Sequence, residues 1–143
     1  MPPPVGAAPR YMLDTNTLLY AMRAAARGAN TSLIARMEGR LAGELVLSAI
    51  TLGEMEHGWR AGHGDRAAAA PFLAMVPVLP FDATAAAGFG TVMAGLGKPK
   101  RRTYDRLIAG HALALGLTVV TTNVQDFADV AGLAVEDWAV EGA

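Results

Sequence analysis

The stretch that decides the fold is YMLDTN, residues 11–16, in which a short apolar run stops abruptly at an acid. Residues 11–13 have the length and composition of a buried strand. Asp14 and the residues after it favour turns and helix starts, so the sequence predicts a strand that ends at Leu13 and a helix that follows it. In an open parallel sheet, ligand sites lie beyond the carboxyl ends of the strands. Asp14 is therefore the first candidate for a functional residue.

Outward from this stretch, apolar runs alternate with helical patterns to the end of the chain. Further strands are expected at residues 45–47, 78–79, 118–121 and 133–136. Helices are expected at residues 17–26, 31–38, 49–60, 83–96 and 104–115, with another from Asp65 that Pro71 should kink or split. Strands separated by helices imply crossover connections. The predicted fold class is α/β, a three-layer α/β/α sandwich with a mostly parallel central sheet.

Length and composition limit the class of protein. With 143 residues, 52% hydrophobic and 17% charged, the chain is expected to form one folded domain rather than a disordered segment. The absence of cysteine excludes a disulfide framework and a thiolate metal site. Residues 1–9 are proline-rich without the features of a signal peptide, so we expect a flexible tail there and a single domain over residues 10–143. No uninterrupted apolar run suggests a membrane span, and a cytoplasmic protein is the simplest interpretation.

Three more acids stand where the chain passes from a predicted strand to a loop or helix. Glu54 lies just inside the helix after the second strand, Asp105 opens the helix at 104–115, and Asp126 follows the strand at 118–121. Gathered with Asp14 at one edge of a parallel sheet, these carboxylates would repel one another unless a cation lay between them. The sequence thus suggests a metal site.

Four motifs carry a family resemblance: LDTN (13–16), SAITLGE (48–54), YDRLIAGHAL (104–113) and VTTNVQDF (120–127). In this order and spacing they resemble the motifs of PIN-domain ribonucleases, with the VapC-type toxins of bacterial toxin–antitoxin pairs as the most similar branch. The resemblance runs from about Tyr11 to Trp138. By position, Asp14, Glu54 and Asp105 match the family's invariant acids, and Asp126 matches the acid before the final phenylalanine.

The resemblance implies a metal-dependent endoribonuclease that hydrolyses RNA phosphodiester bonds, and the residue types suit that chemistry. Two Mg²⁺ or Mn²⁺ ions about 4 Å apart can generate the nucleophile and neutralise charge on the attacking and leaving oxygens. Such ions prefer oxygen ligands. Asp14 would be the central ligand with Asp105 and Asp126 beside it, and Glu54 could bind directly or orient a water. Four neutral residues could hydrogen-bond these carboxylates or the scissile phosphate: Asn16, Thr121, Thr122 and Asn123. Asn123 falls where many family members have a further acid.

Each acid also has a purely structural interpretation. Asp105 could cap its helix, Asp14 could simply end a strand, and Asp126 could be a turn residue. His111 lies six residues after Asp105 on the same helix, away from its i+3 and i+4 neighbours, and is expected to be a packed or hydrogen-bonded structural histidine.

Five of the twelve basic residues are gathered in nine positions around Asp105: Lys98, Lys100, Arg101, Arg102 and Arg106. A positive segment beside an acidic metal site suits an RNA backbone, because cations bind the flanking phosphates. The alternative is an ordinary solvated surface. Members of the family often carry a Gly-Ile/Pro-type stretch here, so substrate preference is the property this departure affects. Tyr104 and Trp59 could stack on bases, although packing is the more common role for both.

The resemblance also implies a cognate antitoxin that presents a basic side chain to the acids. The helices within residues 17–37 and 49–60 are rich in apolar residues, and we expect them to form part of a groove for an amphipathic antitoxin helix. These residues could instead pack wholly within the fold or in a homodimer. Two other functions compete with the nuclease: a PIN-like scaffold that binds RNA or protein without cutting, and a haloacid-dehalogenase-type phosphatase. The phosphatase needs an acid where Asn16 stands. A receiver domain lacks support, because its paired acids at the first strand end are missing.

Overall fold

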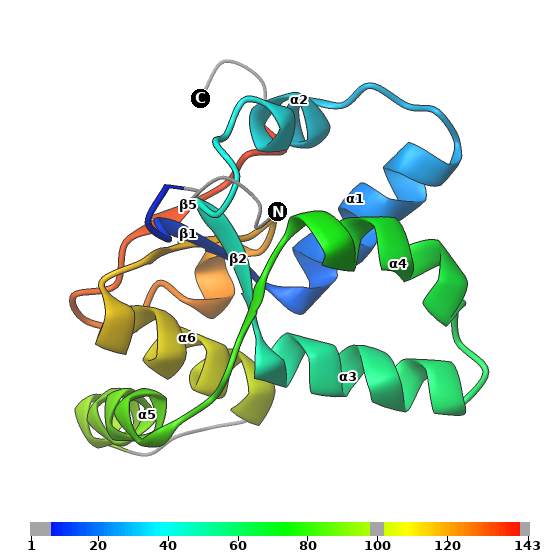
Figure 1. The fold of residues 1–143 in the computed structure, drawn as a ribbon. Coiled ribbons are helices and arrows are strands. Elements are labelled where there is room, and N and C mark those ends of the chain that lie inside the picture. Colours follow the sequence, from blue (N-terminus) through cyan, green and yellow to red (C-terminus); the bar gives the residue numbers. More distant parts are fainter. Residues whose placement is uncertain (1–6, 98–101, 141–143) are drawn as a thin grey trace, which may run out of the picture.

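The computed structural model describes residues 7–97 and 102–140, and its centre is a five-stranded parallel sheet (Figure 1). The strands are β1 (Tyr11–Leu13), β2 (Leu45–Ser48), β3 (Val78–Leu79), β4 (Thr118–Val120) and β5 (Val135–Glu136). Their order is β3-β2-β1-β4-β5. In register, Leu13 pairs with both Leu47 and Val120, so the three central strands end level with one another. Whatever follows these strands in the sequence is therefore brought to one edge of the sheet.

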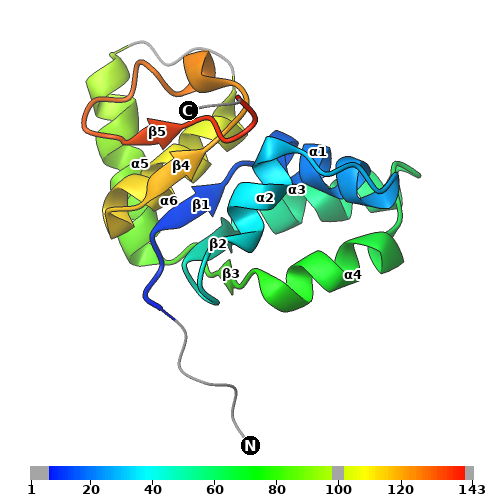
Figure 2. The same cartoon turned by 90° about the horizontal axis from the view of Figure 1, so that it is seen from above.

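Two layers of helix cover the sheet (Figure 2). On one side lie α1 (Thr15–Ala26), α2 (Ser32–Glu38) and α4 (Arg66–Met75), with most of the apolar face of α3 (Ala49–Arg60). On the other lie α5 (Ala83–Leu96) and α6 (Thr103–Leu115). Leu13 packs in the first core and Met12 in the second, as the alternation of side chains along a strand requires. The predicted three-layer α/β fold is confirmed, and all of its strand pairings are parallel.

Side-chain caps fix where most helices begin. Each capping oxygen accepts a hydrogen bond from a backbone N–H in the first turn of its helix, and the caps are Asp14, Thr31, Ser48, Asp65 and Asp82. Helix α4 runs without a break through Pro71, so of the predicted kink or split, the split does not occur. Ala69 is fully buried, and Phe72 and Leu73 pack against the same core, so burial on both sides of Pro71 holds the helix together.

Helices α5 and α6 pack at unusually close range through glycine. A β-carbon on Gly88 would lie 2.1 Å from the carbonyl oxygen of Gly110, and one on Gly110 would lie 2.4 Å from the backbone of Phe89. This contact holds α6 firmly, and with it the residues of its first turn.

The predicted tail at residues 1–9 lies mostly outside the described residues, but Ala7 donates a backbone hydrogen bond to the carbonyl oxygen of Ala42 at 2.9 Å. Within the described part of the chain, no helix is both long and apolar enough to cross a membrane.

Candidate active site

Asp14 is the most constrained acid in the structure. It caps α1, with Oδ1 accepting from the backbone N–H of Thr17 at 2.9 Å, and Oδ2 accepts from the hydroxyl of Thr121 at 2.8 Å. Its side chain is buried, and burial raises the pKa of the Asp14 carboxyl. The hydrogen bonds from Thr17 and Thr121 oppose that rise, and the charge of Asp126 adds to it. A buried carboxylate held by two donors keeps a fixed position at the end of β1.

Thr17 and Thr121 link the start of α1 to the segment after β4. The hydroxyl oxygen of Thr17 accepts from the backbone N–H of Thr122, and that of Thr121 accepts from the backbone N–H of Asn123, both at 2.9 Å. Thr121 thus contacts an acid, as the sequence suggested. Thr17 was not singled out from the sequence, although its place three residues after a capping aspartate is a signal for such a contact.

Glu54 reaches the same region from α3. Thr15 donates its hydroxyl to Oε1 of Glu54 at 2.6 Å and lies 3.2 Å from the hydroxyl of Thr51. Burial raises the pKa of the Glu54 carboxyl, the hydrogen bond from Thr15 opposes it, and the charge of Asp14 adds to it. Thr15 is a second residue that was not identified from the sequence, where only its acidic neighbour drew attention.

Asp105 lies near enough to the other three acids for their charges to act on it. It lies in the first turn of α6, whose cap position is Arg102, so Asp105 does not cap this helix. Burial raises the pKa of Asp105 to about 6, with further contributions from the charges of Asp14, Asp126 and Glu54. Those three residues come from three other segments, so the fold brings together the four acids that the sequence selected.

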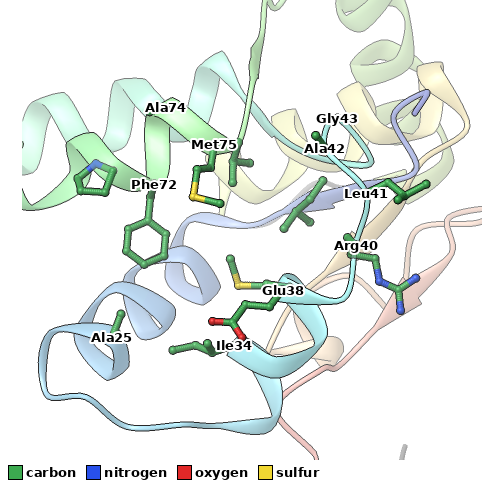
Figure 3. A pocket seen from close by; sticks show the side chains of 14 residues that line it. Ala25, Ile34, Glu38, Arg40, Leu41, Ala42, Gly43, Phe72, Ala74 and Met75 are labelled. Carbon is green, nitrogen blue, oxygen red and sulfur yellow. The ribbon is translucent and has the colours of Figure 1, made fainter. Parts of the chain in front are cut away.

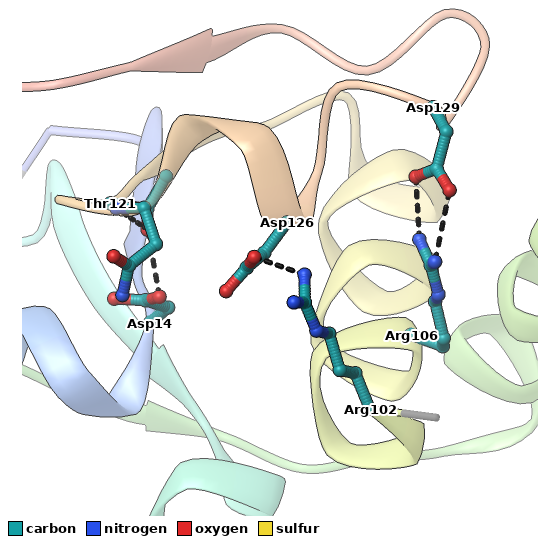
Figure 4. Close-up of polar contacts among 7 residues, drawn as sticks. Asp14, Arg102, Arg106, Thr121, Asp126 and Asp129 are labelled. Carbon is teal, nitrogen blue, oxygen red and sulfur yellow. Dashed lines mark hydrogen bonds and ion pairs between the residues drawn. The ribbon is translucent and has the colours of Figure 1, made fainter. Parts of the chain in front are cut away.

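Arg102 at the N-cap of α6 and Arg106 within the helix pair with acids that follow β4 (Figure 4). Arg102 forms an ion pair with Asp126, which lies in the short 3-10 helix η1 (Val124–Asp126). Arg106 forms two hydrogen bonds to Asp129, at 2.6 and 2.9 Å, and these hold the pKa of Asp129 below its ordinary value. Only 8% of the Arg106 side chain is exposed. The expectation that Arg106 joins an exposed RNA-binding cluster is therefore not met, because its guanidinium is already used inside the fold.

The other residues predicted for the site either lack side-chain hydrogen bonds or lie outside the described residues. Asn16 and Asn123 are exposed, and no side-chain hydrogen bond of Asn16, Thr122 or Asn123 is found among the described residues. The described residues thus show no hydrogen bond from these three side chains to the carboxylates, and the alternative that they contact the scissile phosphate stays a prediction. Lys98, Lys100 and Arg101 lie outside the described residues.

His111 has the structural role expected for it. It is buried, its Nδ1 lies 2.8 Å from the hydroxyl of Ser48, and its ring packs edge-on against Phe81. Burial lowers the pKa of His111. Among the aromatic residues, Trp59 packs against the core and under the guanidinium of Arg66, whereas Tyr104 is 56% exposed beside Asp105.

The donor set fits a hard divalent cation in its chemistry. All four acids offer carboxylate oxygens, and the charges of the other three add to burial in raising the pKa of Asp105. Within residues 7–97 and 102–140, no three acidic or histidine side chains converge closely enough to hold an ion as they stand. Mg²⁺ does not require this, because it commonly binds one or two carboxylates and completes its shell with water and phosphate.

A separate apolar groove of about 520 Å³ opens on the α1, α2 and α4 side of the sheet (Figure 3). It is lined by the end of α1, by α2 and the loop after it, and by α4. Contributing side chains include Ile34, Met37, Leu41, Phe72 and Met75. Two of them are strongly exposed, Leu41 at 67% and Met75 at 78%. The groove prediction was right about α1 and α2, but the second wall is α4, not α3.

Comparisons with known proteins agree with this fold. The PIN domain family model matches residues 11–133. The chain is 32% identical to the tRNA(fMet)-specific endonuclease VapC of Shigella flexneri over 136 residues, which cover 91% of this chain and 98% of that protein. It is 33% identical to the enzyme of the same name from Salmonella typhimurium, over 90% and 98% of the two chains.

Solved structures agree as well. The crystal structure of DNA-bound VapBC from Salmonella typhimurium matches with a TM-score of 0.75 and 31% identity, covering 91% of this chain and 98% of that one. VapBC-1 from nontypeable Haemophilus influenzae matches with a TM-score of 0.72 and 27% identity, at the same coverage.

Proposed function

This chain belongs to the VapC-type branch of the PIN-domain family, and from that membership we propose that it is a ribonuclease that acts as the toxin of a toxin–antitoxin pair. The single observation that carries the catalytic part is the gathering of acids from four segments. Asp14 accepts a hydrogen bond from Thr121 after β4, Glu54 accepts one from Thr15 beside Asp14, and the charges of Asp14, Glu54 and Asp126 act on Asp105. A non-catalytic scaffold would not need this repulsion. A phosphatase of the haloacid-dehalogenase type would need a proton donor two residues after Asp14, where Asn16 stands. Because its proposed substrate is cellular RNA, we propose that the protein acts in the cytoplasm.

The residues of the site divide into two groups by what they do. Asp14 and Glu54 are fixed by threonine hydroxyls, so they present their carboxylates in one orientation. Asp105 and Asp126 supply the rest of the negative charge. We propose that the four acids hold Mg²⁺ or Mn²⁺, which when bound would neutralise the charge that develops on the oxygens around the scissile phosphorus. An acid of the cluster in its charged form can also orient the attacking water and take its proton.

Basic residues would hold the RNA on either side of the scissile bond. Arg102 lies at the start of α6 next to Asp105, and Lys98, Lys100 and Arg101 precede it in the sequence. We propose that these residues bind flanking phosphates and thereby set the position of the strand. Tyr104, exposed on the same turn, is available to stack on a base.

The antitoxin is the proposed protein partner, as in the VapBC complexes that this chain resembles. We propose that it docks on the groove between α2 and α4, which offers apolar side chains without any of the four acids. An amphipathic helix suits such a groove, since its apolar side can cover Leu41 and Met75. The measured mass of the purified complex gives the number of copies of each chain.

The experiment that separates a nuclease from a scaffold is a metal-titrated cleavage assay on purified protein. We expect cleavage of single-stranded RNA with Mg²⁺ or Mn²⁺, loss of cleavage with excess EDTA, and recovery when the ion is restored in excess. Cleavage that persists in EDTA would reject the metal-dependent mechanism, and no cleavage of any RNA under all metal conditions would favour the scaffold.

A further inference from the structure

Arg102 has a backbone conformation that does not suit an arginine. Its φ is +77° and its ψ is +46°, and it is the one non-glycine residue with positive φ in the described part of the chain. This left-handed region is disfavoured for any residue with a β-carbon, and glycine is the residue that usually occupies it. Such a conformation persists where surrounding contacts hold it, and it is often found at functional sites.

The side chain of Arg102 explains what holds it there. Its guanidinium pairs with Oδ1 of Asp126, across 24 positions of sequence, and points toward the acids (Figure 4). The same positive charge partly offsets the three acids that act on Asp105. The cluster therefore already contains a cation, supplied by the chain itself.

A purely mechanical role is a weaker explanation. The segment after β4 is already fastened to α6 by the two hydrogen bonds between Arg106 and Asp129, and Arg106 is buried. A second pair one turn earlier adds little to that attachment, since it is half exposed on the arginine side.

We propose that Arg102 is a resident counter-cation of the acidic cluster, which occupies Asp126 until a divalent ion displaces it. The proposal rests on the proposed function, because it assumes that Asp126 faces a metal ion. An ion that binds Oδ1 of Asp126 must displace Arg102, and an ion at either carboxylate oxygen is repelled by the guanidinium charge. Both effects oppose the ion, so Arg102 weakens metal binding by acting on Asp126. If Arg102 served only to hold Asp126 in place, removing it would weaken metal binding, because Asp126 would lose its position.

The test is Mn²⁺ binding by isothermal titration calorimetry on the full chain without RNA. Arg102→Gly removes the guanidinium and suits the left-handed backbone, Arg102→Lys keeps a positive charge, and Arg27→Gln is the matched control. Arg27 caps the far end of the 12-residue helix that begins after Asp14. The length of that helix places it roughly 18 Å from Asp14, beyond the screening length of about 8 Å at physiological salt.

We expect Arg102→Gly to bind Mn²⁺ about two- to fivefold more tightly than wild type, with Arg102→Lys near wild type and Arg27→Gln unchanged. In an Asp126→Asn background the Arg102→Gly change should have no further effect. If Arg102→Gly does not fold, Arg102→Asn serves in its place, since asparagine tolerates the left-handed region.

Equal or weaker Mn²⁺ binding by the Arg102 variant would overturn the proposal, as would tighter binding by Arg27→Gln to the same degree. The absence of Mn²⁺ binding by all proteins would overturn it too. A failure of this kind is distinct from failure of the proposed function, because EDTA-sensitive RNA cleavage by the wild type would still stand.

Discussion

At the scale of single residues, the proposed site contains acids whose charged forms are destabilised in the folded chain. Burial and the neighbouring acids raise the pKa of Asp105 to about 6, and burial raises those of Asp14 and Glu54. For such a group the folded state holds its proton more tightly than the unfolded state does. Stability of the metal-free protein therefore falls as pH rises from the unfolded pKa of Asp105, near 4, through the folded value.

The pH dependence of stability checks this directly. In EDTA, Asp105→Asn should melt at a higher temperature than wild type at pH 8, because it removes one charge from the cluster. The difference should shrink as pH falls from 7 toward 4, since wild-type Asp105 then becomes neutral. Thermal denaturation at several pH values measures it, with Asp65→Asn as a control at an exposed helix cap. A pH-independent difference would show that Asp105 is not the strained group.

At the scale of elements, the sequence predicted more of the backbone than of the side-chain contacts. The strands, the caps Thr31, Ser48 and Asp82, and the end of α6 at Gly116 follow from local rules, because a capping oxygen or a left-handed glycine acts within a few residues. The partners of Arg102 and Arg106 lie more than 20 positions away in the sequence, so no local pattern predicts them.

The same limit applies to residues near the acids. Thr15 and Thr17 hold acids through hydrogen bonds that depend on how α1 and α3 meet. Asp14, Glu54 and Asp126 could be predicted to lie together because each comes after a strand of the parallel sheet, and topology brings such residues to one edge. Asp105 lies in α6, which follows α5, so its place among the acids was predicted from the family resemblance of its motif.

The basic residues that precede α6 in the sequence are predicted to bind RNA, whereas Arg106 within α6 is not. Replacing Lys98, Lys100 and Arg101 together with glutamine should weaken RNA binding and reduce the slope of log affinity against log salt by up to about 2, because fewer counterions are released. Arg106→Gln should leave that slope unchanged but lower the melting temperature, since it strips Asp129 of a buried partner. Binding measured between 50 and 200 mM salt decides the matter. An unchanged slope in the triple variant would make the segment an ordinary solvated surface.

At the scale of the whole molecule, the proposed nuclease site and the groove lie at different parts of the sheet. The acids gather at the carboxyl edge of the strands, whereas the groove lies between α2 and α4. Apolar richness in the helices predicted that a groove would exist. It did not predict which helices would form its walls, because that depends on how α4 packs across the sheet.

This separation predicts that the two functions can be altered independently. Met75→Glu places a charge in the groove at a side chain that is 78% exposed, so it should weaken the antitoxin complex without lowering stability or RNA cleavage. Leu115→Glu is the matched control, an exposed apolar residue of α6 outside the groove. Co-expression and co-purification with the cognate antitoxin measure the complex. A complex that survives Met75→Glu but not Leu115→Glu would place the partner elsewhere.

The central claim is that the acidic cluster cleaves RNA, and Asp14→Asn tests it most directly. Asparagine can still cap α1 through its carbonyl oxygen, so the fold should be kept while one charge of the cluster is lost. With Mg²⁺ or Mn²⁺ present, we expect purified wild type and Asp65→Asn to cut single-stranded RNA and Asp14→Asn to be inactive, with normal circular dichroism. Cleavage by folded Asp14→Asn at the wild-type rate would contradict the account.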